Sequence, residues 1–511
     1  MRENLINVGN WIEKWARIQP EKIALISEGT PYTYRELDQR INRLSNFFLD
    51  TGLKKGGRVG VLLRNCKQYI EIFFALSKIG GILVPLNWRL TPSELEFILR
   101  DSGTDMIIFE TEFMANAEVL REKVKVTTNI SCTIGEKVKK PDTPSWTFDY
   151  ETSIKRYSDK NPVPSWSSGD TDPHIIMYTS GTTGLPKGAI LSHRKTFFNV
   201  LNAEICFDLA GNDIVIIGRS LFHSGGLIVE MAPVMYKGGT IIVHRRFQPQ
   251  EILETVEQQK VTILELPATV YSFILDECNM DDYDLSSLKC CFTGGERVPV
   301  SLLQAFAEKG IFISQIYGLT EASTLFWLPI KKVHEKMGSV GQPVFHGDVR
   351  IINKHGKQVK TGEIGEIIVS GPTVMNGYWK RKDLTAEVIK DGWLHTGDLA
   401  RVDENGFTYI VDRKTNMFIS GGENIYPAEV EKAIIHHPSI VDAAVIGVPD
   451  KKWGEVGKAY IVVKDGARIS ARDVTGFLRD KLARYKIPKR IEFIKKLPKT
   501  ASGKIRKHLL K

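Results

Sequence analysis

The segment that decides the fold is Ile175-Ile176-Met177-Tyr178-Thr179-Ser180-Gly181-Thr182-Thr183-Gly184-Leu185-Pro186-Lys187-Gly188. Its first four residues predict a buried strand, and the loop that follows is rich in glycine and hydroxyl groups. Glycines let backbone N–H groups approach an anion, the hydroxyls add hydrogen-bond donors, and Lys187 adds a positive charge. The loop therefore suits a polyphosphate, although it is not a Walker loop, because Pro186 precedes the lysine and no Ser or Thr follows it.

Strand and helix signals alternate on both sides of this loop. A helix is expected to begin near Tyr34, because Thr33 and Glu36 have capping-box spacing and apolar residues then recur at helical spacing. A second helix is expected around 69–79. Short apolar runs predict strands at 57–63, 82–86, 105–109, 214–217, 240–244, 262–266 and 288–292. This alternation is typical of α/β layers with largely parallel sheets.

The pattern changes toward the C-terminal end. After about Gly338, residues 347–353 and 365–370 have the appearance of β-rich pieces with tight turns, and residues 416–511 have a mixed α and β pattern of their own. That last segment has the size of a small domain. The sequence therefore predicts a large N-terminal α/β region of several subdomains, built of layered sheets and helices, followed by a small α+β domain.

Composition narrows the class of protein. The 511 residues, 42% apolar and 25% charged, are enough for two or more packed cores of a globular protein. No apolar run approaches the roughly 20 residues of a membrane span, and the first residues lack a signal-peptide core, so an intracellular, cytoplasmic protein is expected. The six scattered cysteines form neither a CxxC pair nor a zinc spacing, so we interpret them as buried or incidental thiols.

The net charge of +9 is concentrated at the C-terminal end of the chain. Residues 481–511 hold twelve Lys or Arg and one acid, Glu492, a net charge of +11, so the rest of the chain sums to −2. Such a segment can bind a polyphosphate, an acidic membrane or nucleic acid. No nucleic-acid motif accompanies it, so we expect a solvated surface and no nucleic-acid partner. Peripheral membrane contact and a homodimer stay open.

The opening loop, from Tyr178 to Gly188, resembles the signature loop of the acyl-adenylate-forming superfamily. That superfamily holds acyl-CoA synthetases, aryl-CoA ligases, peptide-synthetase adenylation domains and beetle luciferases. The resemblance runs from about Tyr34 to Lys507, because further motifs follow in the family's order. They are Gly294-Gly295-Glu296-Arg297, Tyr317-Gly318-Leu319-Thr320-Glu321, Trp393-Leu394-His395-Thr396-Gly397-Asp398, Asp412-Arg413 and Pro498-Lys499-Thr500-Ala501-Ser502-Gly503-Lys504.

The resemblance implies a site for ATP and Mg²⁺. The aromatic face of Tyr317 would stack on the adenine, and Thr320 would meet a phosphate. Glu321 would offer a hard oxygen to Mg²⁺, and Asp398 would accept hydrogen bonds from the ribose hydroxyls. The nucleotide-binding residues implied are Thr179, Ser180, Gly181, Thr182, Thr183, Gly184, Lys187, Gly295, Glu296, Arg297, Tyr317, Gly318, Thr320, Asp398, Arg413 and Lys504.

Four residues are implied as catalytic: Lys504, Thr320, Glu321 and His223. Lys504 would act electrostatically. The substrate carboxylate and the α-phosphate are both anionic, so a cation between them offsets their repulsion and stabilises the charge that develops in the transition state. Eleven other basic residues lie nearby in the sequence, so the motif, and not the charge, distinguishes Lys504.

The resemblance also divides the chain into a large AMP-binding domain (1–412), a hinge (413–416) and a small mobile domain (417–511). The family usually carries Asp or Lys two residues after the hinge arginine, whereas this sequence has Thr415 there, preceded by Lys414. The pivot can still work, because a hinge needs only to absorb backbone rotation. Residues placed where related enzymes contact coenzyme A are Gly421, Gly422, Glu423, Trp453, Tyr485 and Lys486.

The segment Leu221-Phe222-His223-Ser224-Gly225-Gly226-Leu227 resembles the family's aromatic gate and acyl pocket. His223 would sit beside the carboxylate and gate between the half-reactions; the alternative is a packed histidine at a helix start. Small residues would leave room for a chain or a ring, which favours medium or long fatty acids first and aryl acids (benzoate-, cinnamate- or succinylbenzoate-like) second. The pocket residues implied are Phe222, His223, Gly226, Leu227, Gly294 and Gly318.

The expected reaction has two steps. The acid attacks the α-phosphate of ATP, giving acyl-AMP and pyrophosphate; the small domain then rotates, the thiol of coenzyme A attacks the acyl carbon, and AMP leaves. A carrier-protein-loading adenylation enzyme is the nearest alternative, but residues 221–227 contain no carboxylate to hold an amino group. Luciferase-like oxidation is not excluded by motif. A nucleotide-binding protein without turnover is disfavoured by the joint presence of Lys504, Glu321 and Asp398.

Overall fold

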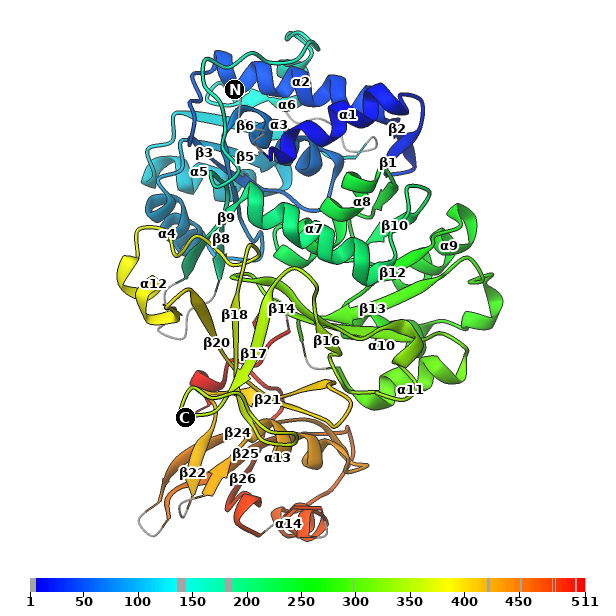
Figure 1. Cartoon of the computed structure of the whole chain (residues 1–511), viewed down its shortest axis with the longest axis vertical. Coiled ribbons are helices and arrows are strands. Elements are labelled where there is room, and N and C mark those ends of the chain that lie inside the picture. The colour runs from blue at the N-terminus through cyan, green and yellow to red at the C-terminus, as the bar shows by residue number, and fades with distance from the viewer. Residues whose placement is uncertain are drawn as a thin grey trace. The chain divides into compact units, whose positions relative to one another are not determined.

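The computed structural model describes residues 6–135, 144–179, 186–296, 298–420, 423–450, 453–479, 481–482, 484–500 and 503–510. They form two compact units (Figure 1). The first unit holds Met1–Val349 and Val369–Leu394, and the second holds Arg350–Ile368 and His395–Lys511. Residues 413–416 lie inside the second unit, and their role as a hinge stays a prediction. Among the described helices, none has the length and apolar character needed to cross a membrane.

The first sheet of the first unit has seven strands in the order β7-β6-β5-β3-β4-β8-β9. All neighbours are parallel except β8 and β9, which form an antiparallel hairpin. That hairpin flanks the predicted phosphate loop and pairs Thr179 with Lys187. The strands are β3 (Arg58–Leu62), β4 (Ile82–Pro85), β5 (Met106–Glu110), β6 (Thr128–Cys132), β7 (Phe148–Asp149), β8 (Pro173–Thr179) and β9 (Lys187–Ser192).

The second sheet of the first unit has nine strands in the order β16-β15-β14-β13-β12-β10-β11-β1-β2. The six from β14 to β1 are parallel, and the outer strands β2, β15 and β16 are antiparallel to their neighbours. The carboxyl ends of β10, β12, β13 and β14 therefore share one edge. The strands are β1 (Ile23–Ser27), β2 (Thr30–Thr33), β10 (Ile214–Ile217), β11 (Thr240–Val243), β12 (Ile263–Glu265), β13 (Cys290–Gly294), β14 (Ile313–Leu319), β15 (Ser323–Trp327) and β16 (Gln342–Pro343).

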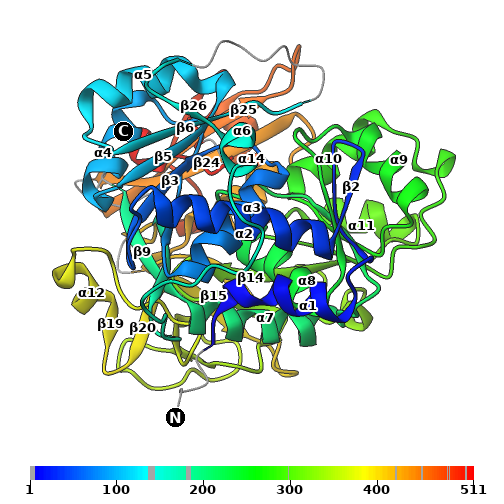
Figure 2. The ribbon, with the colours of Figure 1, turned by 90° about the horizontal axis from the view of Figure 1, so that it is seen from above.

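Helices pack around these sheets. The capping box at the start of α2 is present: Thr33 Oγ1 accepts from the Glu36 N–H at 3.2 Å, and the Glu36 carboxylate accepts from the Thr33 N–H at 2.8 Å. Figure 2 shows α1 beside α8, where the Trp15 indole donates to the carbonyl of Tyr236 at 2.8 Å. The helices are α1 (Trp11–Ile18), α2 (Tyr34–Asp50), α3 (Lys67–Ile79), α4 (Pro92–Ser102), α5 (Met114–Lys123), α6 (Tyr150–Ile154), α7 (His193–Phe207), α8 (Ala232–Lys237), α9 (Pro249–Gln259), α10 (Ala268–Glu277), α11 (Val300–Glu308) and α12 (Lys382–Val388).

A buried carboxylate ties α2, α3 and α6 together. Glu71 on α3 is fully buried, and its carboxylate accepts from Arg40 Nε at 2.6 Å and from the Tyr150 hydroxyl at 2.7 Å. A buried charge is tolerated only when such partners surround it. Removing only one partner of this ion pair is therefore expected to lower the stability of the protein.

The chain passes between the two units within β17, β18 and β20. These strands belong to a five-stranded sheet with the order β17-β18-β20-β19, in which β21 also pairs with β20. Its strands are β17 (Asp348–Ile352), β18 (Gly365–Ser370), β19 (Ile389–Lys390), β20 (Trp393–Val402) and β21 (Thr408–Arg413).

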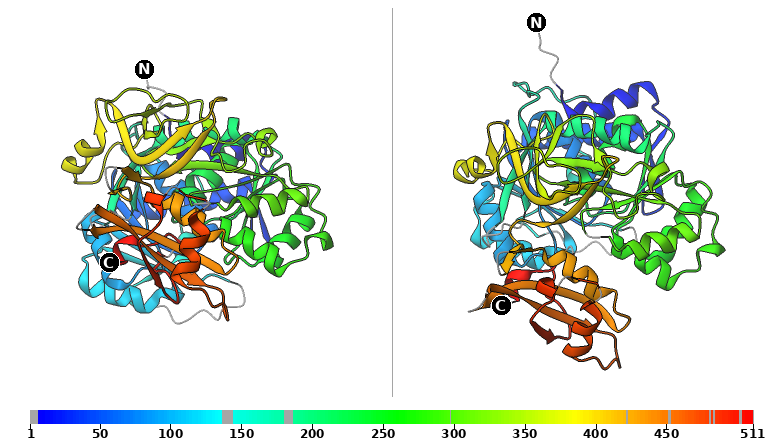
Figure 3. Two further views of the ribbon diagram at one scale, coloured as in Figure 1. Left: turned by 90° about the horizontal axis from the view of Figure 1, so that it is seen from below. Right: turned by 60° about the horizontal axis from the view of Figure 1, so that its bottom comes forward.

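The C-terminal part of the second unit is a mixed sheet with two helices, drawn in orange and red in Figure 3. The order is β23-β22-β25-β24, with β26 beside β25. Apolar side chains of α13 and α14, among them Val430 and Leu478, join a core with Val445 and Ile461. The elements are β22 (Phe418–Ser420), β23 (Glu423–Ile425), α13 (Pro427–Ile435), β24 (Ile440–Asp450), β25 (Gly454–Val463), α14 (Ala471–Arg479) and β26 (Arg490–Phe493).

The predicted fold class is confirmed. Each strand expected from an apolar run is present, as β3, β4, β5, β10, β11, β12 and β13, with bounds shifted by at most a few residues. Most of these strands are buried along their whole length, which is why they appear in the sequence as continuous apolar runs. The two β-rich pieces after Gly338 are β17 and β18, and the C-terminal segment is α+β.

Candidate active site

Several predicted site residues lie at the carboxyl edge of the nine-stranded sheet. Gly294 ends β13, and Gly295 and Glu296 follow it; Tyr317 and Gly318 lie in the adjacent parallel strand β14. Ligands of open α/β sheets bind outside the carboxyl ends of the strands. The predicted residues outside the described part of the chain are Ser180, Gly181, Thr182, Thr183, Gly184, Arg297, Gly421 and Gly422.

Glu321 connects this edge to the start of the predicted phosphate loop. It follows Thr320 in the turn between β14 and β15, and its Oε1 accepts from the Tyr378 hydroxyl at 2.9 Å and from Thr179 Oγ1 at 3.4 Å. Lys187 Nζ lies 5.4 Å from the centre of the Tyr378 ring. The structure thus brings together four residues of the site, three of which the sequence predicted; Tyr378 was not predicted, because no local signal links it to Glu321.

The donor set at Glu321 suits Mg²⁺. This cation is bound by one or two carboxylates together with substrate phosphates, and it keeps several waters. Within the described ranges, no group of three or more His, Cys, Asp or Glu side chains could hold a metal by itself. Glu321 would therefore hold Mg²⁺ only together with a phosphate-bearing ligand, which is the role that its position beside Thr179 allows.

The turn that carries Thr320 and Glu321 is anchored from beneath by Lys195. This lysine on α7 is 1% exposed, and its Nζ donates to Ser323 Oγ. Ser323 has a φ of +59°, a left-handed conformation that is unfavourable for a residue with a side chain. Burial lowers the pKa of Lys195 to about 7, although attraction to Glu321 opposes the shift. A lysine is rarely buried, so no sequence pattern singles this residue out.

At three glycines that were predicted to line the acyl pocket, the neighbouring backbone leaves no room for a Cβ atom. A Cβ on Gly318 would lie 2.1 Å from the carbonyl oxygen of Ser323, and one on Gly294 would lie 2.3 Å from that of Ile316. A Cβ on Gly226 would lie 2.7 Å from the carbonyl oxygen of Ser220. The space beside these glycines is already occupied by protein, so the expectation that they leave room for the acyl group has no support at these positions. Their place in an acyl pocket stays a prediction.

The predicted gate lies just before a π-helical segment, Gly225–Met231, which includes Gly226 and Leu227. Phe222 is buried, whereas His223 is exposed, and their ring centres are 4.3 Å apart. Asn65 fixes the preceding backbone: it donates to the carbonyl of Arg219 and accepts from the Leu221 N–H, both at 2.8 Å. His223 is therefore not packed into a core, and an exposed ring is compatible with a gate.

In the second unit, Asp398 and Arg413 face each other on β20 and β21. Arg413 Nε donates to Asp398 Oδ1 at 2.9 Å, and the Asp398 side chain is 8% exposed against 53% for Arg413. The neighbouring Asp412 accepts from the Arg413 N–H and from the Ala428 N–H, both at 2.7 Å. Ala428 lies at the start of α13, so Asp412 ties the predicted hinge to that helix.

Lys504 lies in a tight turn near the C-terminal end. Its backbone N–H donates to Thr500 Oγ1 at 3.1 Å, and its carbonyl accepts from the Thr500 N–H at 2.7 Å. Of the residues expected to contact coenzyme A, Trp453 and Tyr485 are exposed, and Lys486 Nζ pairs with Glu429 at 2.6 Å. Glu423 begins β23. These assignments stay predictions.

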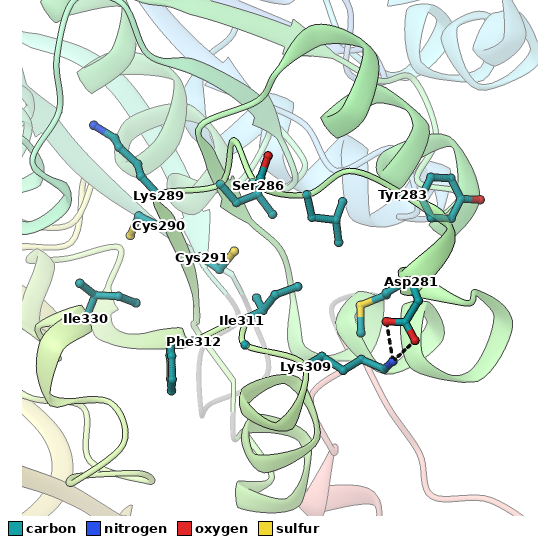
Figure 4. A pocket seen from close by; sticks show the side chains of 14 residues that line it. Asp281, Tyr283, Ser286, Lys289, Cys290, Cys291, Lys309, Ile311, Phe312 and Ile330 are labelled. Carbon is teal, nitrogen blue, oxygen red and sulfur yellow. Dashed lines mark hydrogen bonds and ion pairs between the residues drawn. The ribbon is translucent and has the colours of Figure 1, made fainter.

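A pocket of about 410 Å³ lies at the opposite edge of the nine-stranded sheet (Figure 4). It is lined by Cys290, the first residue of β13, and by Phe312, which precedes β14. Its two lysines are already paired, Lys309 with Asp281 at 3.2 Å and Lys289 with Asp213 at 2.8 Å. The pocket contains none of the predicted site residues, and its paired cations do not favour a phosphate ligand.

Family models, sequence relatives and solved structures all place this chain in the same family. Residues 12–379 match the model of the AMP-binding enzyme family, and residues 429–504 match that of the AMP-binding enzyme C-terminal domain. A feruloyl-CoA synthase of an Amycolatopsis species is 41% identical over 98% of this chain and 97% of its own. An indoleacetate–CoA ligase of Aromatoleum aromaticum is 34% identical over 98% and 97%. The o-succinylbenzoate CoA synthetase of Bacillus subtilis, solved with its acyl-adenylate, is 32% identical, with a TM-score of 0.87 and 98% of both chains covered.

Proposed function

The chain belongs to the AMP-binding enzyme family, and from that premise we propose that it joins an aryl carboxylic acid to coenzyme A through an acyl-adenylate. The aryl class is supported by the names of the three relatives, because ferulate, indoleacetate and succinylbenzoate each carry an aromatic ring. The sequence alone favoured a medium or long fatty acid, and none of these names supports that preference.

The first half-reaction forms the adenylate. ATP lies along the carboxyl edge of the nine-stranded sheet, with its phosphates near Thr179, Lys187 and Thr320. The acid's carboxylate oxygen attacks the α-phosphorus, the bond to the bridging oxygen breaks, and pyrophosphate leaves. Glu321 would hold Mg²⁺ together with the phosphates, and the cation would neutralise part of their charge. Lys504 offsets the repulsion between carboxylate and phosphate.

The second half-reaction transfers the acyl group. The thiol sulfur of coenzyme A attacks the acyl carbon, the bond from carbon to the phosphate oxygen breaks, and AMP leaves. The thiol proton passes to solvent or to a base, and we propose His223, which is exposed at the predicted gate, as that base. No covalent bond to the enzyme is needed.

One observation carries the nucleotide part of the proposal. Glu321 holds Thr179, the last described residue before the phosphate loop, against the turn that presents Thr320. A carboxylate, hydroxyls and a lysine converge there from two sheets. This is the arrangement that a metal-bound polyphosphate requires, and apolar ligands would gain nothing from it.

The test is release of pyrophosphate from ATP with Mg²⁺, with and without coenzyme A. The acids are ferulate, cinnamate, indoleacetate, 2-succinylbenzoate, decanoate and palmitate. We expect release with at least one aryl acid and formation of its thioester when coenzyme A is present. Lys504→Ala is expected to lower the adenylation rate by about 100-fold or more, whereas Lys495→Ala, an exposed lysine of the same basic segment, should not.

The other outcomes separate the alternatives. Release with decanoate or palmitate, and with none of the aryl acids, would restore the fatty-acid hypothesis. Adenylate without a thioester would favour loading of a carrier protein. ATP binding with no release from any acid would contradict the proposal and favour a nucleotide-binding protein without turnover.

A further inference from the structure

A buried charge cluster lies beside the predicted acyl segment, and the proposed reaction gives it no role. Arg219 follows β10, Glu230 belongs to the π-helical segment, and Glu265 ends β12. Arg219 Nε donates to Glu265 Oε1 at 2.5 Å, and its backbone N–H donates to Glu230 Oε2 at 3.2 Å. The two glutamates are 1–2% exposed, while the Arg219 side chain is 16% exposed. Arg219 is therefore the member of the cluster that is partly exposed.

The guanidinium of Arg219 is held between two segments of the predicted site. Its Nη2 donates to the carbonyl of Gly294 at 2.8 Å. A Cβ on Gly225 would lie 2.8 Å from its Cδ, and a Cβ on Gly295 would lie 3.4 Å from its Nη1. These two glycines, unlike Gly226, Gly294 and Gly318, leave space in which the arginine lies.

One nitrogen of the Arg219 guanidinium has no hydrogen-bond acceptor among the described residues. Nε and Nη2 are hydrogen-bonded, but within the part of the chain that the structure describes Nη1 makes no hydrogen bond, and it is not enclosed by protein. The guanidinium thus presents its Nη1 amino group, which carries two N–H donors. That group lies between the acyl segment and the loop after β13.

The sheet order sets the distance between this donor and the phosphate end of the site. Glu321 follows β14, whereas Glu265 ends β12, and β13 lies between them. The Arg219 guanidinium bridges the end of β12, through Glu265, and the end of β13, through the Gly294 carbonyl. Neighbouring strands are roughly 4.8 Å apart, so it lies between one and two intervals, roughly 5–10 Å, from β14. An acid whose carboxylate meets the α-phosphate near β14 would therefore reach Arg219 with a benzene ring, either directly attached or on a side chain of up to three carbons.

The charges around Arg219 determine which chemical group of a substrate it can bind. Burial raises the pKa of Glu230 well above its usual range, and the neighbouring Glu265 raises it further. Burial lowers the pKa of Arg219, but attraction to Glu265 and Glu230 outweighs it, so the arginine keeps its charge. Glu265, Glu230 and Glu296 all lie close enough to favour the charged form of Arg219, so the charge of the arginine is already balanced by carboxylates of the protein. A second carboxylate on the substrate would bury an uncompensated charge, and an apolar group would leave Nη1 without an acceptor.

We propose that Arg219 recognises the far end of the acid by donating from Nη1 to a neutral oxygen on the ring, so that the enzyme prefers oxygen-substituted aryl acids. This inference rests on the proposed function. Phenol, ether and carbonyl oxygens satisfy it, whereas unsubstituted rings and dicarboxylic acids do not. A charged donor to a neutral acceptor stabilises a complex enough to give a preference of about tenfold or more in kcat/KM.

The first test compares three acids of one shape with the wild-type enzyme: cinnamate, 4-hydroxycinnamate and 4-carboxycinnamate. We expect kcat/KM to be highest for the hydroxy acid, about tenfold or more above cinnamate, and lowest for the dicarboxylic acid. Equal values for cinnamate and 4-hydroxycinnamate, or a preference for 4-carboxycinnamate, would overturn the inference while the ligase function stands. No pyrophosphate from any acid would overturn the ligase function itself.

The second test uses paired substitutions that leave no lone charge buried. Arg219→Met with Glu265→Gln should remove the preference for the hydroxy acid over cinnamate, mainly through KM. The control is Arg245→Met with Glu110→Gln, a second arginine–glutamate pair of the first unit with 21% and 2% exposed side chains. The control pair should keep the wild-type preference. Retention of the preference in the Arg219 variant would refute the role of that arginine. If the variant does not fold, the kcat/KM ratios of the wild-type enzyme in the first test decide whether the inference stands.

Discussion

Replacing Lys195 with methionine should stabilise the first unit at neutral pH, by an amount that shrinks as the pH rises. In the unfolded chain the lysine has a pKa of 10.5, and burial lowers it to about 7 in the native protein. Between these values the unfolded chain binds a proton that the native protein does not, so wild-type stability rises with pH across this window. Methionine does not titrate and fits an apolar environment.

The magnitude follows from the two pKa values. At pH 7 the unfavourable transfer of the lysine into the protein costs about 4 kcal/mol relative to a group that does not titrate, and at pH 9 it costs about 2 kcal/mol. The substitution also removes the hydrogen bond to Ser323, and this loss offsets about 1 kcal/mol of the stability that is gained. Lys195→Met should therefore be more stable than the wild type by about 3 kcal/mol at pH 7, and the difference should fall by about 2 kcal/mol at pH 9.

The measurement is urea unfolding of both proteins at pH 7 and pH 9, following the transition of the first unit. Lys14→Met, which replaces an exposed lysine on α1, serves as the control and should show the same pH profile as the wild type. A difference in stability between Lys195→Met and the wild type that does not change with pH would refute the conclusion that burial lowers the pKa of Lys195. Adenylation should also slow in Lys195→Met, because the turn that presents Glu321 loses its anchor.

Three further changes test the packing and the site. Gly318→Ala should cost about 1–3 kcal/mol in a thermal melt and slow adenylation, because its Cβ would lie 2.1 Å from the carbonyl oxygen of Ser323; an unchanged melting temperature would contradict the close approach. Glu71→Gln should cost about 2–3 kcal/mol in urea unfolding, because it removes one of the two carboxylates that pair with Arg40, while Glu151 stays at 2.8 Å; a loss below about 1 kcal/mol would show that the pair is solvated. Asp398→Asn should raise the KM for ATP with little change in unfolding, and an unchanged KM would remove Asp398 from the nucleotide site.

Local signals in the sequence were sufficient for the elements and for the order of the motifs. The hydrogen bonds between Thr33 and Glu36 form within one turn of chain, and the apolar run of β5 needs no partner to be recognised as a buried strand. The predicted phosphate loop, the turn at Glu321 and the turn at Lys504 are likewise short segments, and their resemblance to the family's motifs, in the same order, predicted their roles. Family and reaction class could therefore be predicted from the sequence alone.

Only the tertiary structure decided which distant residues meet. Tyr378 reaches Glu321 across 57 residues, and Lys195 reaches Ser323 across 128, with no periodicity or spacing to indicate either contact. The same holds for the glycines: residue type suggested an open pocket, but the neighbouring backbone fills the space at Gly294 and Gly318 and leaves room for Arg219 at Gly225 and Gly295. Sequence patterns report hydrogen bonds and burial within a few residues, whereas the shape and charge of a site come from packing between elements that the chain brings together only when it folds.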